Sequence, residues 1–207
     1  IERAQRKVEA HNFDIRKNLL EYDDVANDQR KVVYHQRSEL MAADEIEDSV
    51  AAIREEVIAD AVALHIPPGS LEEQWDAEGL SKALEADFGL QLDIAGLVAN
   101  DKSINDDGIR DYCIEQAARA YAEREEKIGG ELMRNVEKQV MLRQLDHHWK
   151  EHLAAMDHLR QGIGLRSYAQ KNPKQEYKRE AFEMFGAMLE QVKHDTISIL
   201  SRIRIQG

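Results

Sequence analysis

The stretch from His148 to His152 has the sequence H-W-K-E-H and places two imidazoles and a carboxylate within five residues. On a helix, this H-x-x-E-H spacing is where some metalloproteases bind zinc and use the glutamate as a base. A catalytic zinc needs a third protein ligand, and the residues downstream offer none that can be identified. We therefore expect no metal site, with His152 hydrogen-bonded at a helix interface and His147 and His158 on the surface. A zinc hydrolase remains an alternative, which stoichiometric zinc in the purified protein would support.

Other catalytic patterns are missing from the sequence. There is no phosphate-binding G-x-x-x-x-G-K-[ST] loop, no glycine-rich dinucleotide turn and no G-x-S-x-G elbow. The neighbouring Asp23 and Asp24 cannot form a catalytic dyad, because adjacent residues on a helix point about 100° apart. We expect this chain to contain neither catalytic nor cofactor-binding residues, and therefore no ATPase activity of its own.

The stretch from Val140 to Ile203 predicts two long helices joined by a short basic turn. The first arm has an apolar stripe at alternating three- and four-residue steps, made of Leu142, Leu145, Trp149, Met156, Leu159 and Ile163 and interrupted by His152. The second arm begins with Asn172 as N-cap and Pro173 at the first helical position. Its stripe is Phe185, Met188, Val192, Ile199 and Ile203. We expect Gly162 or Gly164 to end the first arm in the left-handed conformation.

The turn of this hairpin is the first candidate for a binding surface. From Gln161 to Glu180 there are five basic and two acidic residues, in a chain whose formal net charge is -12. Tyr168 lies between Leu165 and Lys171 in this turn, and an exposed amphipathic ring is typical of a protein-binding surface. The alternative is an ordinary solvated loop.

The first 41 residues contain no glycine or proline and predict one helix of about 60 Å, at 1.5 Å per residue. Its stripe is interrupted by Asn12, Gln29 and Gln36, which favours contacts with different neighbours over a strict coiled coil. The chain begins without methionine and already within the helical pattern. We expect it to be part of a longer protein.

Composition and charge predict an all-α chain with three segments. Few glycines, few aromatic residues and 33% charged residues favour helices over sheets. Residues 1–43 have no net charge, 44–130 carry -15 and 131–207 carry +3. The acidic middle segment predicts several short helices, with Ser70 and Glu73 as a capping box and Asp106 or Asp107 capping the last helix. The acidic balance disfavours nucleic-acid binding, and no apolar run is long enough to span a bilayer.

Three stretches closely resemble the SecA family, the motor ATPases of bacterial protein export. They are NLLEYDDVANDQR from Asn18, IPPGSLEEQWD from Ile66, and WKEHLAAMDHLRQGIGLRSYAQKNPKQEYKRE from Trp149. The resemblance implies that residues 1–43 are the long helix of a helical scaffold domain and that 44–130 are a helical wing domain. Residues 131–207 would complete the scaffold and contain its two-helix finger.

The resemblance also implies partners and roles. The finger tip would contact the SecYEG channel and unfolded preprotein, which by motif position assigns Leu165, Arg166, Tyr168, Lys171 and Lys174. The scaffold would contact other SecA domains through Tyr22, Asp23, Asp24, Asp28, Arg30 and Trp149. ATP and magnesium would bind in motor domains, and zinc in a tail, that have no counterpart in these residues.

The family further implies a cytoplasmic protein, peripherally associated with the inner membrane, that can form a homodimer. A different class of function remains open. The chain could be a free-standing helical adaptor that binds a protein partner through the basic turn, without a motor.

Overall fold

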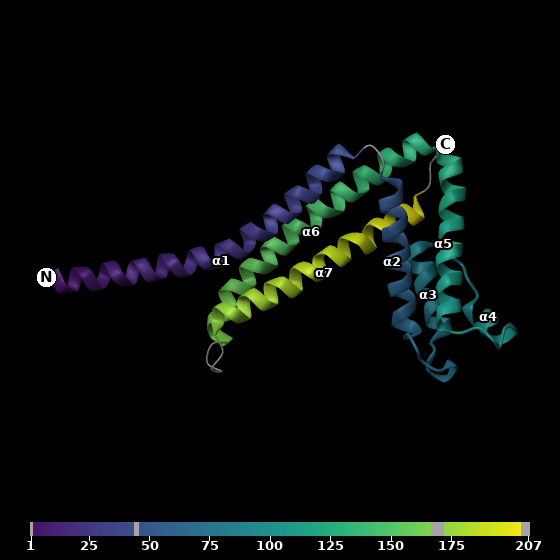
Figure 1. Ribbon diagram of the computed structural model, residues 1–207, viewed down its shortest axis with the longest axis horizontal. Coiled ribbons are helices and arrows are strands. Elements are labelled where there is room, and N and C mark those ends of the chain that lie inside the picture. Colours follow the sequence, from purple (N-terminus) through teal and green to yellow (C-terminus); the bar gives the residue numbers. More distant parts are fainter. Residues whose placement is uncertain (1, 44–45, 167–171, 204–207) are drawn as a thin grey trace. The chain divides into compact units, whose positions relative to one another are not determined.

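A computed structural model describes the backbone of residues 2–43, 46–166 and 172–203, and their side chains except those of 2–4, 15, 18, 165 and 166. The described chain is helical and contains no strand, which confirms the all-α prediction (Figure 1). The elements are α1 Glu2–Ala42, α2 Glu47–His65, the 3-10 turn Glu72–Gln74, α3 Ala77–Phe88, α4 Ile94–Asn100, α5 Asp106–Ile128, α6 Gly130–Arg166 and α7 Pro173–Arg202. No helix among the described residues is long and apolar enough to cross a membrane.

The chain divides into two compact units. The first unit combines Ile1–Glu39 with Leu145–Gln191, and the second combines Leu40–Gln144 with Val192–Gly207. The division by charge into 1–43, 44–130 and 131–207 follows a different criterion and stays a prediction.

The first unit is built from α1, the later part of α6 and the earlier part of α7. Its core is contributed by all three helices: Met156, Leu159, Ile163, Tyr177 and Ala181 are buried, and Tyr22, Val25, Ala26 and Met184 pack against them. The rings of Tyr22 and Tyr177 meet edge to face with centroids 4.8 Å apart, a favourable aromatic geometry. The long first helix and the predicted hairpin therefore share one core.

The end of the first hairpin arm differs from the prediction. Helix α6 continues through Gly162 and Gly164 to Arg166, and neither glycine has a positive φ. Ile163 lies between them and is 3% exposed, so burying its side chain keeps the last turn helical. The start of the second arm is confirmed, because α7 begins at Pro173 and Asn172 Oδ1 accepts a hydrogen bond from the Lys174 amide at 3.0 Å.

The apolar face of α7 is only partly the predicted one. Met188 is buried as expected. Towards the end of the helix, however, Ile197 and Leu200 are fully buried, whereas Ile199 and Ile203 are only half-buried. These last residues of α7 belong to the second unit, so a different set of neighbours selects a different face.

The second unit has the larger core. Leu80, Leu84, Phe88, Ile94, Ile109, Cys113, Met133, Ile197 and Leu200 are at most 1% exposed and come from α3, α4, α5, α6 and α7. Burial raises the pKa of the Cys113 thiol to about 12, so this single cysteine is an inert core residue rather than a reactive thiol.

Two predicted helix caps in this unit are wrong. Asn105, not Asp106 or Asp107, caps α5, since its Oδ1 accepts from the Gly108 amide at 2.9 Å. Asp106 instead accepts a hydrogen bond from the Gly69 amide at 2.7 Å. Ser70 forms no capping box with Glu73, and its hydroxyl donates to the Pro67 carbonyl. The polar residues of these two loops therefore bind each other and their own turns.

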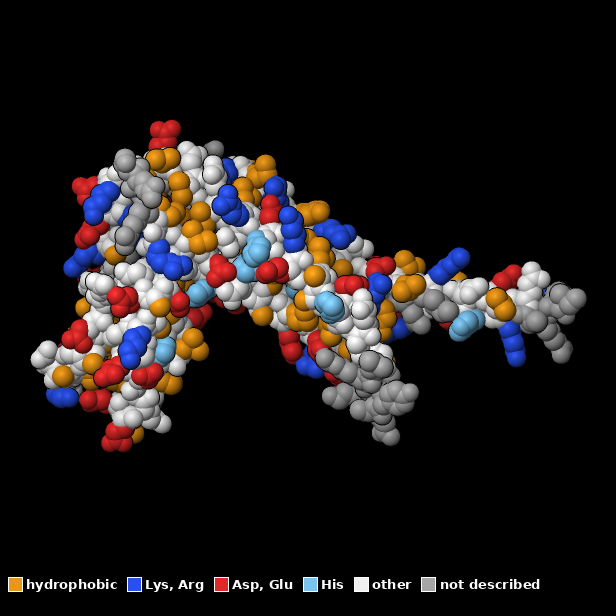
Figure 2. Space-filling view, turned by 180° about the vertical axis from the view of Figure 1, so that it is seen from behind, with side chains coloured by type: hydrophobic (Ala, Val, Ile, Leu, Met, Phe, Trp, Pro, Cys, Tyr) orange, Lys and Arg blue, Asp and Glu red, His pale blue; other side chains and the backbone are white. Residues whose placement is uncertain are grey.

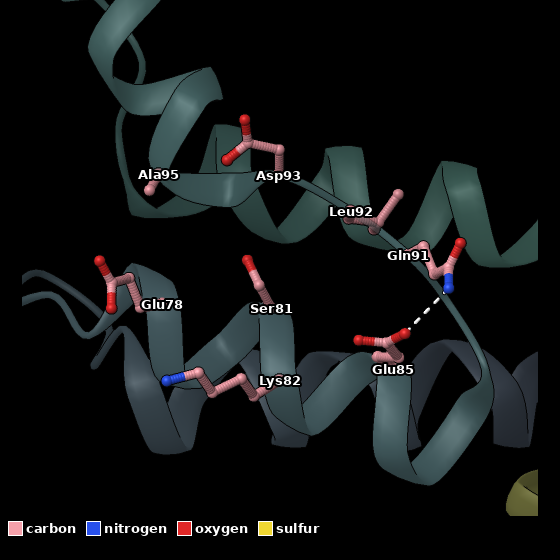
Figure 3. A pocket seen from close by; sticks show the side chains of 8 residues that line it. All are labelled: Glu78, Ser81, Lys82, Glu85, Gln91, Leu92, Asp93 and Ala95. Atoms are coloured by element: carbon pink, nitrogen blue, oxygen red, sulfur yellow. Dashed lines mark hydrogen bonds between the residues drawn. The ribbon is translucent and has the colours of Figure 1, made fainter.

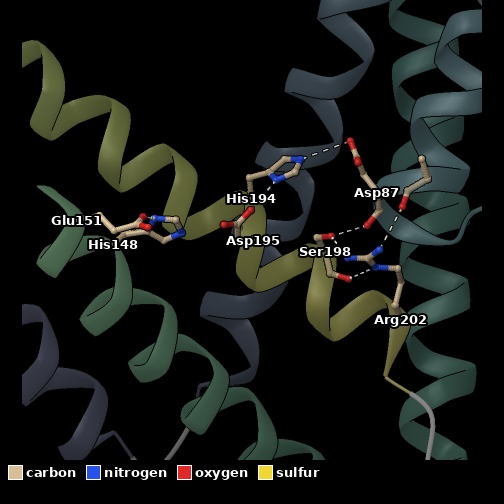
Figure 4. A network of polar contacts seen from close by, with 8 residues as sticks. Asp87, His148, Glu151, His194, Asp195, Ser198 and Arg202 are labelled. Carbon is tan, nitrogen blue, oxygen red and sulfur yellow. Dashed lines mark hydrogen bonds and ion pairs between the residues drawn. The ribbon is translucent and has the colours of Figure 1, made fainter. Parts of the chain in front are cut away.

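Side chains near the end of α7 cap the end of α3. Ser198 Oγ donates to the Asp87 carbonyl at 2.7 Å, and Arg202 Nη1 donates to the Ala86 carbonyl at 3.3 Å (Figure 4). His194 lies 3.6 Å from the Asp87 carboxylate. Because the last carbonyls of a helix lack partners within it, these side chains satisfy groups that α3 cannot.

Candidate functional site

A buried polar bridge joins the three helices of the first unit. Gln29 Nε2 on α1 donates to the Ala181 carbonyl on α7 at 3.0 Å, and Gln29 Oε1 lies 2.7 Å from His152 Nε2 on α6. With the amide nitrogen committed to Ala181, the amide oxygen accepts from the His152 N–H. His152 is 5% exposed, and burial lowers its pKa and so favours the neutral imidazole. The predicted interface role of His152 is confirmed.

Trp149 lies one turn before this bridge. Its ring stacks on the His152 ring with centroids 5.6 Å apart and meets the Phe185 ring edge-on at 6.4 Å. The side chain is 7% exposed and lines one end of a groove of about 550 Å³ between α1 and α6. The other residues of that groove are Val33, Tyr34, Arg37, Ser38, Asp146 and Lys150. Whether Trp149 also serves a contact with another domain stays a prediction.

Two of the five predicted contact residues on α1 meet the hairpin, and one predicted tip residue meets α1. Tyr22 packs on Tyr177, and Asp23 Oδ1 lies 3.1 Å from Arg160 Nη1 of α6. The predicted tip residue Lys174 forms an ion pair with Glu21 of α1 at 2.5 Å. The hydrogen bond from Lys174 lowers the pKa of the Glu21 carboxyl. The start of α7 is thus held to α1.

The other three predicted residues on α1 lie on its surface or bind locally. Asp28 pairs with Lys31 at 3.1 Å, Arg30 donates to Asn27 at 3.1 Å, and Asp24 is exposed. These short-range contacts leave the side chains accessible. Their proposed contacts with other domains remain predictions.

The tip itself is largely outside the described residues. This applies to Tyr168 and Lys171, and to the side chains of Leu165 and Arg166. Their assignment to partner binding stays a prediction.

Two residues of the interface were not predicted from the sequence. Tyr177 and Ala181 are 3% and 0% exposed and carry the contacts of α7 to α1. Their spacing of four from Pro173 and from each other is a helical signal that could have extended the stripe towards the turn. Alanine is weakly apolar, so its position alone is a poor indicator of a core residue.

The first half of α1 has a different environment. Every described side chain from Gln5 to Leu20 is exposed, including Val8 at 58%, Phe13 at 66% and Leu20 at 62%. Figure 2 shows separate orange hydrophobic groups among charged ones on the extended α1 segment at the right. That another domain covers this part of α1 stays a prediction.

The structure does not bring His148, Glu151 and His152 together as the H-x-x-E-H motif would require. His152 points into the core, whereas Glu151 is exposed and lies beside His148 and His147. Glu151 Oε2 is 3.4 Å from His148 Nδ1 (Figure 4), and Glu151 Oε1 is 3.5 Å from His147 Nε2. The described structure therefore offers no zinc-hydrolase geometry through His152.

The second unit has a cleft of about 610 Å³ between α3 and the start of α4 (Figure 3). Its polar groups serve local structure. Asp93 caps α4 by accepting from the Gly96 amide at 2.8 Å, Ser81 accepts from the Ile94 amide at 3.2 Å, and Gln91 donates to Glu85 at 2.9 Å. We assign no ligand to this cleft.

A buried acid lies deeper in the same unit. Glu137 is 0% exposed, accepts a 2.6 Å hydrogen bond from the Tyr121 hydroxyl and lies 3.1 Å from Arg134. Burial raises the pKa of Glu137 and also that of Tyr121. The Arg54 guanidinium stacks over the Tyr121 ring at 4.4 Å. This arrangement joins α2, α5 and α6.

Comparisons with a family profile and with individual proteins identify the same family. The SecA Wing and Scaffold domain profile matches residues 1–204. The protein translocase subunits SecA of Nitrosococcus oceani and Stenotrophomonas maltophilia are each 57% identical to this chain over its whole length, and that of Methylobacillus flagellatus is 54% identical. The chain spans 23% of the length of each of these relatives. This match, together with the all-α fold and the long hairpin, places the chain in the SecA wing and scaffold domain family.

Proposed function

We propose that the chain is the wing and scaffold part of a SecA-type protein translocase subunit and that its role is mechanical. Movement of ATP-driven motor domains would reach α1, pass to the α6–α7 hairpin, and act on the SecYEG channel and unfolded preprotein. In this proposal the chain itself holds no nucleotide. ATP and magnesium bind in motor domains, and zinc binds in a tail, of the longer protein.

The observation that carries this proposal is the 54–57% identity to SecA translocase subunits over the whole chain. The contacts of the first unit supply a physical route. The Gln29 bridge and the Tyr22–Tyr177 contact fix α1 to both hairpin arms. A displacement of α1 would therefore move the hairpin rather than slide past it.

Further properties follow from the family and belong to the same proposal. The longer protein would be cytoplasmic and peripherally associated with the inner membrane, and it could form a homodimer. Nucleic acid is not an expected partner, because the net charge of -12 disfavours binding to phosphates.

The finger-tip role is tested by Tyr168→Ala in the full-length SecA-type protein. We expect a strong loss of preprotein transport into vesicles that contain SecYEG. Tyr168→Phe should retain more transport than Tyr168→Ala, because an aromatic ring contacts a polypeptide over a large area and loses little side-chain entropy on binding. Phe182→Ala is the matched control, since Phe182 is an exposed aromatic on the same hairpin. Transport by Tyr168→Ala at the wild-type rate would remove the tip from the proposal.

The free-standing adaptor is distinguished by the gene. A phosphate-binding loop encoded in frame before Ile1 excludes the adaptor, whereas a start codon beside Ile1 without a motor sequence supports it.

A further inference from the structure

His147, His148 and Glu151 bring three metal-ligating side chains to one place on α6. One ligand atom from each of the three lies within 4.8 Å of the others. The sequence motif pointed to a different set, because it included His152, which is committed to Gln29 in the core. The three residues lie in the first unit and play no part in the proposed translocation role.

The spacing explains why the three side chains converge. Viewed down the helix axis, at 100° per residue, Glu151 lies between the two histidines. It is about 40° from His147 and about 60° from His148. Its carboxylate can therefore lie between the two imidazoles, with one oxygen near each ring. The rings themselves lie with centroids 5.1 Å apart.

The two separations between the Glu151 oxygens and the histidine nitrogens are close to those around a small cation. Two ligands at 2.0–2.1 Å from a tetrahedral zinc ion are about 3.3 Å apart. The distances from Glu151 to His147 and His148 are 3.5 and 3.4 Å. The ligand atoms of His147 and His148 lie within 4.8 Å of each other, so binding one cation requires the two imidazoles to move closer together. The His147 and Glu151 side chains are 59% and 61% exposed, so a cation can reach them from solvent.

We propose that His147, His148 and Glu151 form a surface site for one divalent cation of the zinc class. Two imidazole nitrogens and one carboxylate favour zinc, nickel or copper over magnesium or calcium, which prefer oxygen ligands. The remaining coordination positions are open to water or to a donor from another molecule. Because Glu151 is a ligand in this site, it does not serve as the catalytic base that the H-x-x-E-H motif would require.

The test uses the full 207-residue chain, without a histidine tag and stripped of metal by a chelator. Titration calorimetry with Zn²⁺ measures the dissociation constant, and visible absorption of bound Co²⁺ reports its ligands. We expect one saturable site that excess Mg²⁺ does not displace. His147→Ala and Glu151→Gln should each weaken Zn²⁺ binding at least about tenfold, since even residues that only support a metal ligand contribute that much.

His158→Ala is the matched control. His158 is an exposed histidine on the same helix, with Ala154, Ala155, Gln161 and Gly162 three and four residues away, so it has no neighbouring ligand on its face. This variant should bind Zn²⁺ with wild-type affinity. His147→Ala and Glu151→Gln alter exposed side chains, and an unchanged circular dichroism melt confirms that they fold. Absence of saturable Zn²⁺ binding, or wild-type affinity in either of these two variants, overturns the proposed three-ligand site.

Discussion

Buried polar side chains, rather than apolar contacts alone, determine how the helices of each unit pair. In the first unit, Gln29 and His152 satisfy each other and the Ala181 carbonyl. In the second unit, Tyr121 and Arg134 share Glu137. A buried polar group without a partner costs roughly 1–3 kcal/mol, so a shifted helix register would leave these groups unpaired and is disfavoured.

Trp149 is expected to contribute strongly to the stability of the first unit. It is 7% exposed and stacks against His152 and Phe185, so Trp149→Ala should lower the free energy of unfolding by about 3–5 kcal/mol. Chemical denaturation followed by circular dichroism measures this change. Phe182→Ala is the control, because Phe182 is 77% exposed and its loss should cost no more than about 0.5 kcal/mol. Equal effects of the two substitutions would contradict the packing described for Trp149.

Glu137 should make stability depend on pH. Burial raises the pKa of its carboxyl above the ordinary value of 4.5, so the folded chain binds this proton more readily than the unfolded chain. Its contribution to stability is therefore present below pH 4.5 and is lost as pH rises through the raised pKa. Glu137→Gln cannot lose a proton and keeps an acceptor for Tyr121.

The measurement is the free energy of unfolding of wild type and Glu137→Gln across a pH series. The difference, wild type minus variant, should fall as pH rises above 4.5. Lowered pKa values of other carboxyls, such as Asp76 and Asp101, affect both proteins equally and cancel in the difference. A difference that rises with pH would show that Arg134 dominates over burial and favours the charged carboxylate.

At the scale of elements, the sequence predicted which helices exist better than where they end. The uninterrupted pattern of residues 1–41 correctly predicted α1, and Asn172–Pro173 correctly predicted the start of α7. Both predictions depend only on local chemistry. The end of α6 depends on burial of Ile163, which glycine propensity does not reveal. The cap of α5 was ambiguous because Asn105, Asp106 and Asp107 are all competent caps.

In the candidate site, too, the sequence predicted local features but not contacts between distant residues. The interface role of His152 followed from its place on an apolar stripe, which is a property of one helix. Its partner Gln29 is 123 residues away in sequence, and Gln29 in turn donates to Ala181, 152 residues further along the chain. No pattern within one helix specifies that pairing. In the sequence, Gln29 was recognised only as a polar residue that interrupts the apolar stripe of residues 1–41.

Two glycines should respond to alanine in opposite directions. Gly129, between α5 and α6, has φ of 90°, a conformation that side chains disfavour, so Gly129→Ala should cost about 1–3 kcal/mol. Gly162 is helical and has open space at its Cβ position, so Gly162→Ala should stabilise the chain by about 0.5–1 kcal/mol. Thermal and chemical denaturation of both variants measure the signs. Destabilisation by Gly162→Ala would indicate that α6 ends before Gly162, as the sequence alone suggested.

At the scale of the whole molecule, the net charge is concentrated in one segment of the chain. Residues 44–130, within the second unit, carry -15, whereas the exposed half of α1 presents Val8, Phe13 and Leu20. Helix α1 packs against the hairpin through residues from Tyr22 onwards and exposes its earlier apolar side chains. In the proposed function, this exposed first half of α1 meets the motor domains.

The most direct test of this proposal is the ATPase rate of a SecA-type motor core that lacks the residues matching this chain. The chain alone should show no turnover, and adding it should change the rate of the core in a saturable way. A variant with serine at Val8, Phe13 and Leu20 should fold equally well, since these side chains are exposed, but should lose that effect. ATPase activity in the rigorously purified chain, or an unchanged core rate despite demonstrated binding, would contradict the proposed coupling.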